Sequence, residues 1–119
     1  MKRIGAHYLY INPDVLLKNG VVEIDDNGVV TDYFSLNDID VESANTEFYT
    51  GFLVPAFVNA TIHQLWEMQQ KFPNATIIDF LKSELVNIEK GQQTEIWLFE
   101  NVDLVNVKIT AETIITKII

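Results

Sequence analysis

The chain has no cysteine, and only 3 prolines and 5 glycines among its 119 residues. Without cysteine it can form neither disulfides nor thiolate metal sites, which is typical of a cytoplasmic protein. It also has no long hydrophobic run, because polar residues soon interrupt the stretch that follows the positively charged start at Lys2 and Arg3. We therefore expect a cytoplasmic protein with no secretion signal and no membrane span.

Basic residues are scarce as well, with 8 Lys and Arg against 17 Asp and Glu and a net charge of −9. None lies between Lys18 and Lys71, an interval that holds Glu23, Asp25, Asp26, Asp32, Asp38, Asp40, Glu42, Glu47 and Glu67. Such a surface repels phosphate backbones, so we expect no nucleic-acid binding. Solubility explains the excess of acid, and an acidic docking surface for a basic partner is the alternative.

Apolar residues make up 48% of the chain, which is ordinary for a globular core. A chain of this length can bury roughly two-thirds of its unfolded surface, and no interdomain linker interrupts it. We therefore predict a single domain covering residues 1–119.

The first half of the chain is typical of β-structure. Asn19-Gly20 favours a tight hairpin turn, and Asp25-Asp-Asn-Gly28 favours a second turn, which together predict a three-strand meander. The acidic stretch 35–45 has no apolar periodicity and predicts a surface loop. The predicted strands cover Ala6–Ile11, Val15–Lys18, Val21–Ile24, Val29–Phe34 and Glu47–Val54.

From Thr61 the apolar period becomes helical. Thr61 with Gln64 fits a capping box, and Ile62, Leu65, Trp66 and Phe72 form an apolar stripe. Pro73 should end this helix. Thr76 and Asp79 favour a second start, and Lys90-Gly91 a stop, so we predict helices at about 61–72 and 76–90.

The carboxyl end returns to β-branched segments at Glu95–Phe99, Val105–Ile109 and Thr113–Ile119. Neither terminal set has enough strands to bury an apolar face alone, so the two must share one sheet or sandwich. The predicted class is α+β and mainly β. Within the domain, strands fill 1–58 and 92–119, and helices fill 59–91.

The segment between the two sets, Gly51-Phe-Leu-Val-Pro-Ala-Phe-Val-Asn-Ala-Thr-Ile-His63, delivers polar side chains at the end of an apolar run. It resembles the first barrel strand of the amidohydrolase superfamily of metal-dependent hydrolases, in which V-P-G-F-V-N-x-H-x-H supplies two histidine ligands. Thr61 stands where the first histidine would be, and Pro55-Ala56 replaces the usual Pro-Gly. Only His63 remains of the pair.

The resemblance extends to both sides. Leu17-Lys-Asn-Gly-Val-Val-Glu-Ile-Asp-Asp-Asn-Gly28 is similar to the opening hairpin of the small β domain that precedes the barrel, and Glu89-Lys-Gly-Gln-Gln-Thr-Glu-Ile-Trp-Leu-Phe-Glu100 to the strands that return to it. A (β/α)₈ barrel needs about 250 residues. The resemblance therefore implies the sandwich-like composite β domain of these hydrolases, with the barrel deleted and two helices in its place.

The family's metal site is mostly missing. The later histidines, the metal-bridging lysine or glutamate and the catalytic aspartate have no counterpart, and the chain has 2 histidines in all. His63, His7 and Glu67 are the candidate ligands, with His63 and Glu67 one helical turn apart. Zinc sites ordinarily need three or four ligands. We therefore expect no catalytic residue, no cofactor and no bound zinc or other divalent metal, and His63 is better explained by a helix start or an interface.

Three functions remain open. The first is a non-catalytic remnant that acts as a structural or interaction module. Loss of the barrel would expose apolar surface, so it predicts a homodimer built on the helices, with Trp66, Leu65, Ile62 and Phe72 at the interface. The second is an accessory or regulatory subunit of a full-length amidohydrolase. The third is a residual hydrolase of C–N bonds whose site forms across a dimer.

Overall fold

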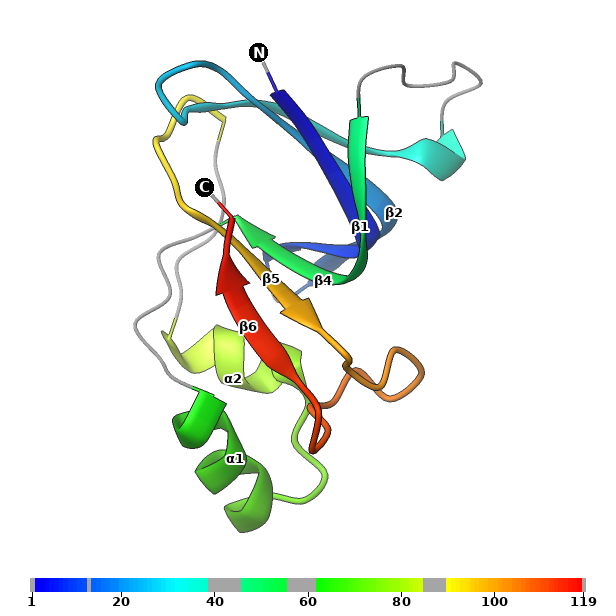
Figure 1. Cartoon of the computed structure of the whole chain (residues 1–119), viewed down its shortest axis with the longest axis vertical. Coiled ribbons are helices and arrows are strands. Elements are labelled where there is room, and N and C mark those ends of the chain that lie inside the picture. Colours follow the sequence, from blue (N-terminus) through cyan, green and yellow to red (C-terminus); the bar gives the residue numbers. More distant parts are fainter. Residues whose placement is uncertain (1, 13, 39–45, 56–61, 85–89, 119) are drawn as a thin grey trace.

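The computed structural model describes residues 2–12, 14–38, 46–55, 62–84 and 90–118, and within these the side chains of Asp38, Ile62 and 82–84 are outside the description. It shows a mainly-β protein, with one six-stranded mixed sheet and two short helices (Figure 1). The order across the sheet is β3-β2-β1-β4-β5-β6, and of these neighbours only β1 and β4 are parallel. The strands are β1 (Lys2–Asn12), β2 (Val15–Ile24), β3 (Val30–Ser35), β4 (Thr46–Pro55), β5 (Ile96–Glu100) and β6 (Ile114–Lys117).

The first three strands form an antiparallel meander, but its strands differ from the predicted ones: the predicted strands Val15–Lys18 and Val21–Ile24 are both parts of β2, and β1 is the first strand of the meander. The hairpin at Asp25–Gly28 is confirmed: the Asp25 carboxylate accepts the backbone N–H groups of Asn27 and Val29 at 2.8 and 3.0 Å, and Gly28 has a φ of 77°. The turn from β1 to β2 follows Asn12, whose side chain accepts the Asp14 N–H at 2.9 Å. Asx-type bonds of this kind explain why these residues favour turns.

The predicted hairpin at Asn19-Gly20 is wrong, because β2 runs through it without interruption. Asn19 does adopt the positive φ that the dipeptide favours, at 51°. Here that conformation is a local irregularity within β2, which stays paired with β1 on both sides of Asn19, and the chain does not reverse. Gly20 is required at the same place, since a Cβ there would lie 2.3 Å from Leu9 Cβ.

The terminal sets of strands do share one sheet, as predicted. β4 pairs with β1 on both sides of a bulge, in which His7 of β1 faces both Thr50 and Gly51 of β4. Beyond the bulge, β4 pairs with β5 from Phe52↔Phe99 to Pro55↔Ile96. The strand that precedes the helices is therefore the direct neighbour of the strand that follows them.

The segment 90–94, which precedes β5, pairs with the backbone at the start of β3, the strand at the opposite edge of the sheet from β6. Gly91 N–H donates to Val30 O at 2.8 Å, Val30 N–H to Gln92 O at 2.9 Å and Thr94 N–H to Gly28 O at 3.0 Å. An ion pair of 3.0 Å between Lys90 and Asp32 lies beside these bonds. Backbone pairing thus joins the start of β3 to the segment that leads into β5.

Two apolar clusters form on opposite faces of the sheet, because successive strand residues point to opposite sides. In β5, Ile96 and Leu98 belong to the first cluster, and Trp97 and Phe99 contribute to the second. The first lies inside the curl of the sheet and includes Ile4, Ala6, Leu9, Ile11, Val22, Ile24, Val30 and Leu53. The second lies under the helices and includes Tyr10, Phe52, Val54, Leu65, Ile77, Phe80, Leu81 and Ile109.

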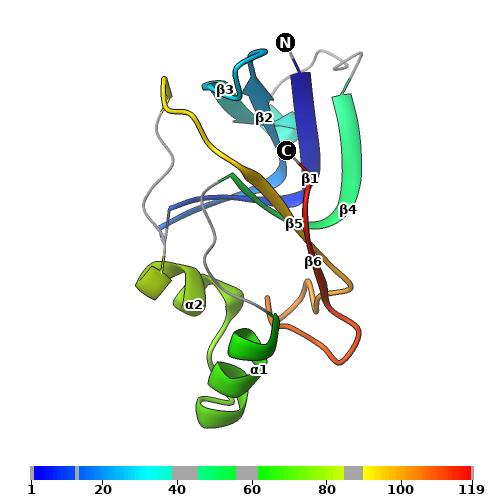
Figure 2. The ribbon, with the colours of Figure 1, turned by 60° about the vertical axis from the view of Figure 1, so that its left-hand side comes forward.

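The helices α1 (Ile62–Lys71) and α2 (Ile77–Glu84) pack against the second cluster (Figure 2). α1 stops just before Pro73, as predicted. The start of α2 is a reciprocal cap: Thr76 N–H donates to the Asp79 carboxylate at 2.9 Å, and Asp79 N–H to Thr76 Oγ1 at 3.2 Å. The predicted Thr61–Gln64 cap and the predicted end of the second helix involve residues 61 and 85–89, which lie outside the described residues.

The predicted strand at Val105–Ile109 is wrong. These residues belong largely to a turn closed by a bridge between Asp103 and Lys108, in which the Asp103 carboxylate accepts the N–H groups of Val105 and Asn106. The Val105 side chain is 90% exposed, so its apolar character does not reflect a buried strand. No helix in the described ranges is long and apolar enough to cross a bilayer.

Candidate functional site

The two candidate ligands His63 and Glu67 lie on α1, one turn apart. His63 Nε2 is 3.1 Å from Glu67 Oε1, and their side chains are 80% and 68% exposed. The predicted helical spacing of this pair is confirmed. His63 therefore lies on a helix, and the strand that would have carried it in the hydrolase family ends here at Pro55. Asn59 and Thr61, the polar residues before it, are outside the described residues.

The third candidate, His7, lies on β1 at the bulge with β4. Its Nδ1 accepts the Gly51 N–H at 3.3 Å, and its ring meets Phe48 edge to face, with centroids 5.7 Å apart. A neutral imidazole that accepts at Nδ1 carries its proton on Nε2, so neither ring nitrogen can bind a metal while this hydrogen bond is kept. In this chain His7 therefore supports the bulge.

Within the described ranges, no group of three or more His, Asp or Glu side chains could hold a metal ion. The fold of one chain thus does not bring His7 together with His63 and Glu67. A site assembled from these residues across two copies stays a prediction.

The predicted interface residues differ in their surroundings. Leu65 is 1% exposed and belongs to the second cluster, so it stabilises the single chain and offers no surface to a partner. Trp66 is half-buried against the same cluster. Phe72, directly after α1, is 62% exposed. The side chain of Ile62 is outside the described residues.

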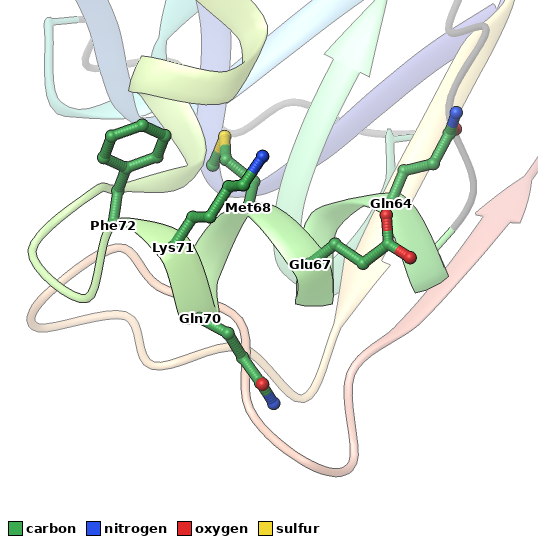
Figure 3. Close-up of a pocket in the computed structure, with 6 residues that line it drawn as sticks. All are labelled: Gln64, Glu67, Met68, Gln70, Lys71 and Phe72. Atoms are coloured by element: carbon green, nitrogen blue, oxygen red, sulfur yellow. The ribbon is translucent and has the colours of Figure 1, made fainter.

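A groove of about 680 Å³ lies along α1 beside Phe72 (Figure 3). It is lined by Gln64, Glu67, Met68, Gln70, Lys71 and Phe72. All six residues come from one helix and the residue after it, so the groove is a surface depression. Sequence reasoning singled out only Glu67 and Phe72 of this set. The spacing of Gln64, Glu67, Met68 and Lys71 could have predicted the groove, because residues three or four positions apart share one face of a helix.

The strongest electrostatic effects lie away from the groove, at contacts that hold the strands together. A hydrogen bond from Arg3 at 2.8 Å is the main cause that lowers the pKa of Glu23, on the neighbouring strand. The Lys90 contact lowers the pKa of Asp32 in the same way, where segment 90–94 meets β3. Burial raises the pKa of Tyr10, whose hydroxyl has no hydrogen-bond partner among the described residues. None of these groups lines the groove.

None of the family models, curated proteins or solved structures compared with this chain matches it. Evidence on its function therefore comes from its own residues.

Proposed function

We propose that this chain is a non-catalytic, cytoplasmic interaction module that derives from the small composite β domain of an amidohydrolase-like enzyme and associates with itself through its helices. In this proposal the curled sheet corresponds to that composite domain. Residues 59–91 take the place of the deleted barrel.

The pairing of β4 with β5 is the observation that carries the proposal. A composite domain interrupted by a large insertion needs the strands on either side of the insertion to be neighbours, so that it can fold around the interruption. The pairs Phe52↔Phe99 and Pro55↔Ile96 have this property. The segment that resembles the metal-binding strand begins on β4, at the point where the insertion would leave the sheet.

The surroundings of the histidines support the non-catalytic part of the proposal. His63 is an exposed helix residue paired with Glu67, and His7 is held by the Gly51 backbone. Metal-dependent hydrolysis requires an ion that activates water, and an ion held by one imidazole and one carboxylate is bound weakly. Resemblance of fold does not transfer a reaction when the groups that perform it are missing.

The helical side of the molecule supports self-association. Phe72 exposes most of its ring, and the partly buried Trp66 and Met68 border the second cluster. In a complete enzyme of the proposed ancestry, a barrel would follow β4 and cover apolar surface on this side. A second copy can bury the same kind of surface.

Light scattering combined with size-exclusion chromatography tests the proposal. At protein concentrations of about 50 μM we expect a mass well above the 13.6 kDa of one chain. A purely monomeric species at this concentration would contradict self-association.

Elemental analysis of protein purified without chelators tests one of the alternatives, a hydrolase site formed across a dimer. We expect less than about a tenth of a metal equivalent per chain, since transition-metal sites need three or four ligands. A stoichiometric metal that is lost when His63 is replaced by alanine would overturn the non-catalytic assignment.

A further inference from the structure

The exposed face of α1 carries both signs of charge in a regular arrangement. Glu67 and Lys71 are one helical turn apart on this face, and Met68 and Phe72 lie one turn apart directly beside them. Figure 3 shows these side chains projecting from one helix and from the residue that follows it. Glu67 and Lys71 both belong to the exposed surface.

This arrangement is self-complementary. If a second α1 lies antiparallel to the first, about a two-fold axis close to Gln69, positions 67 and 71 exchange places across the contact. Glu67 then faces the partner's Lys71, and Lys71 faces the partner's Glu67. Next to this pair of charges, Phe72 lies alongside the partner's Met68, and Met68 alongside the partner's Phe72, as apolar seams do beside flanking charges in helix pairs.

We infer that two copies of this chain associate through an antiparallel α1–α1 contact in which the Glu67 and Lys71 charges pair reciprocally and Phe72 fills the partner's groove. The inference rests on the proposed self-association and specifies its geometry. Isologous contacts of this kind are the commonest way in which identical chains pair.

The charge of the chain explains why we expect a second copy of this chain, and not another protein, to bind at α1. Each copy has a net charge of −9, so most surfaces of two copies repel each other. A face with a cation and an anion at positions that the two-fold axis exchanges converts this repulsion into attraction. Lys71 is available for the contact, because it forms no ion pair within the part of the chain that the structure covers.

The contact is small, which sets the expected affinity. α1 has 10 residues and is therefore roughly 15 Å long. A face of this length buries less than the roughly 800 Å² per partner of a standard interface. The dimer should accordingly be weak and dissociate on dilution, with the exposed Phe72 ring providing most of its apolar area.

Charge reversal tests the geometry. We expect Glu67→Lys or Lys71→Glu alone to raise the dimer dissociation constant about tenfold or more, because each replaces two attractions with two repulsions. The double variant E67K/K71E restores both pairs and should return to within about threefold of the unmodified protein. Sedimentation equilibrium over a range of concentrations measures all three constants.

Glu112→Lys is the matched control. It makes the same change in net charge as Glu67→Lys, at an exposed residue outside the groove, and by reducing the overall repulsion it should leave the dimer unchanged or slightly stronger. The apolar part of the contact is tested by Phe72→Ser, which should weaken the dimer, against Phe48→Ser on β4, which should not. Circular dichroism checks that each variant folds.

The possible results separate the inference from the proposed function. If the unmodified protein dimerises but both single reversals behave like E112K, or the double variant fails to recover, the antiparallel α1 contact is wrong and self-association stands. If the unmodified protein is purely monomeric at about 50 μM, both are wrong. If E67K/K71E restores the dimer dissociation constant and F72S weakens the dimer, the antiparallel α1 contact is supported.

Discussion

Replacement of Gly51 by alanine should strongly destabilise the fold, because this residue lies in the bulge between β1 and β4 and directly against β5. Gly51 has a φ of 141°, and a Cβ there would lie 2.4 Å from the carbonyl oxygen of Phe99 and 3.3 Å from its carbon. A side chain at such a φ costs about 1–3 kcal/mol. Relief of the clash also requires β5 to move away from β4, at an additional cost of about 1–3 kcal/mol.

Gly91→Ala is the matched control, because Gly91 also has a positive φ, of 87°, but nothing lies within 4 Å of the Cβ position. It should cost roughly 1–2 kcal/mol, from the left-handed conformation alone. The difference between the two variants isolates the clash with Phe99. We expect G51A to lose at least about 2 kcal/mol more than G91A in the free energy of unfolding.

Urea denaturation followed by circular dichroism provides the measurement, at low protein concentration so that association adds little. Hydrogen exchange gives a second readout, since the backbone amides shared by β4 and β5 should lose protection in G51A and keep it in G91A. Equal destabilisation of the two variants would refute the close approach of β5 to Gly51, and with it the geometry of the central pairing.

Three further changes test other parts of the fold. Thr76→Ala removes half of the reciprocal cap with Asp79 and should cost about 1 kcal/mol in thermal or urea unfolding; an unchanged stability would mean that α2 starts elsewhere. The Arg3 contact lowers the pKa of Glu23 in the folded protein. The stability that this contact contributes is therefore complete above the pKa of Glu in the unfolded chain, about 4.3, and is lost as the pH falls through the lower pKa of the folded protein. Glu23→Gln should accordingly flatten the acid limb of a stability–pH profile. A profile of unchanged slope would argue against that contact. Tyr10→Phe removes a buried hydroxyl that has no partner among the described residues and should be neutral or stabilising by up to roughly 1 kcal/mol, whereas a marked loss in urea titration would reveal a hydrogen bond.

Local turn and cap chemistry made part of the fold predictable. Asp25 and Gly28 form their hairpin because the bonds that define it lie within five residues, and Thr76 and Asp79 cap α2 for the same reason. Asn19-Gly20 misled the prediction because a positive φ is compatible with a bend as well as with a turn. Only the pairing of β1 with β2 on both sides of the dipeptide distinguishes the two.

Other features depend on contacts that no local pattern contains. The apolar residues after Asp103 have strand composition, yet Val107 adopts a φ of 54°, which a β-branched residue rarely does, and the carboxylate of Asp103 holds the turn. That the two terminal sets share one sheet followed from the need of each set for partners, but the pairing of β4 with β5 and its register did not. The sequence named His7, His63 and Glu67 as candidate ligands, but it did not show that His7 lies on β1 at the bulge while the other two lie on α1.

The hydrogen bond from Gln93 to the backbone of Asn27 links residues 66 positions apart. The amino-terminal meander therefore leaves the ribosome well before segment 90–94 and β5, which complete its sheet, have been synthesised. Until then, the edge of β4 that β5 will cover is open to other nascent chains. Native structure rich in such distant pairings also forms slowly. Transient protection of this edge by a chaperone would accordingly serve the chain best in the short interval between emergence of Pro55 and emergence of Glu100 from the ribosome.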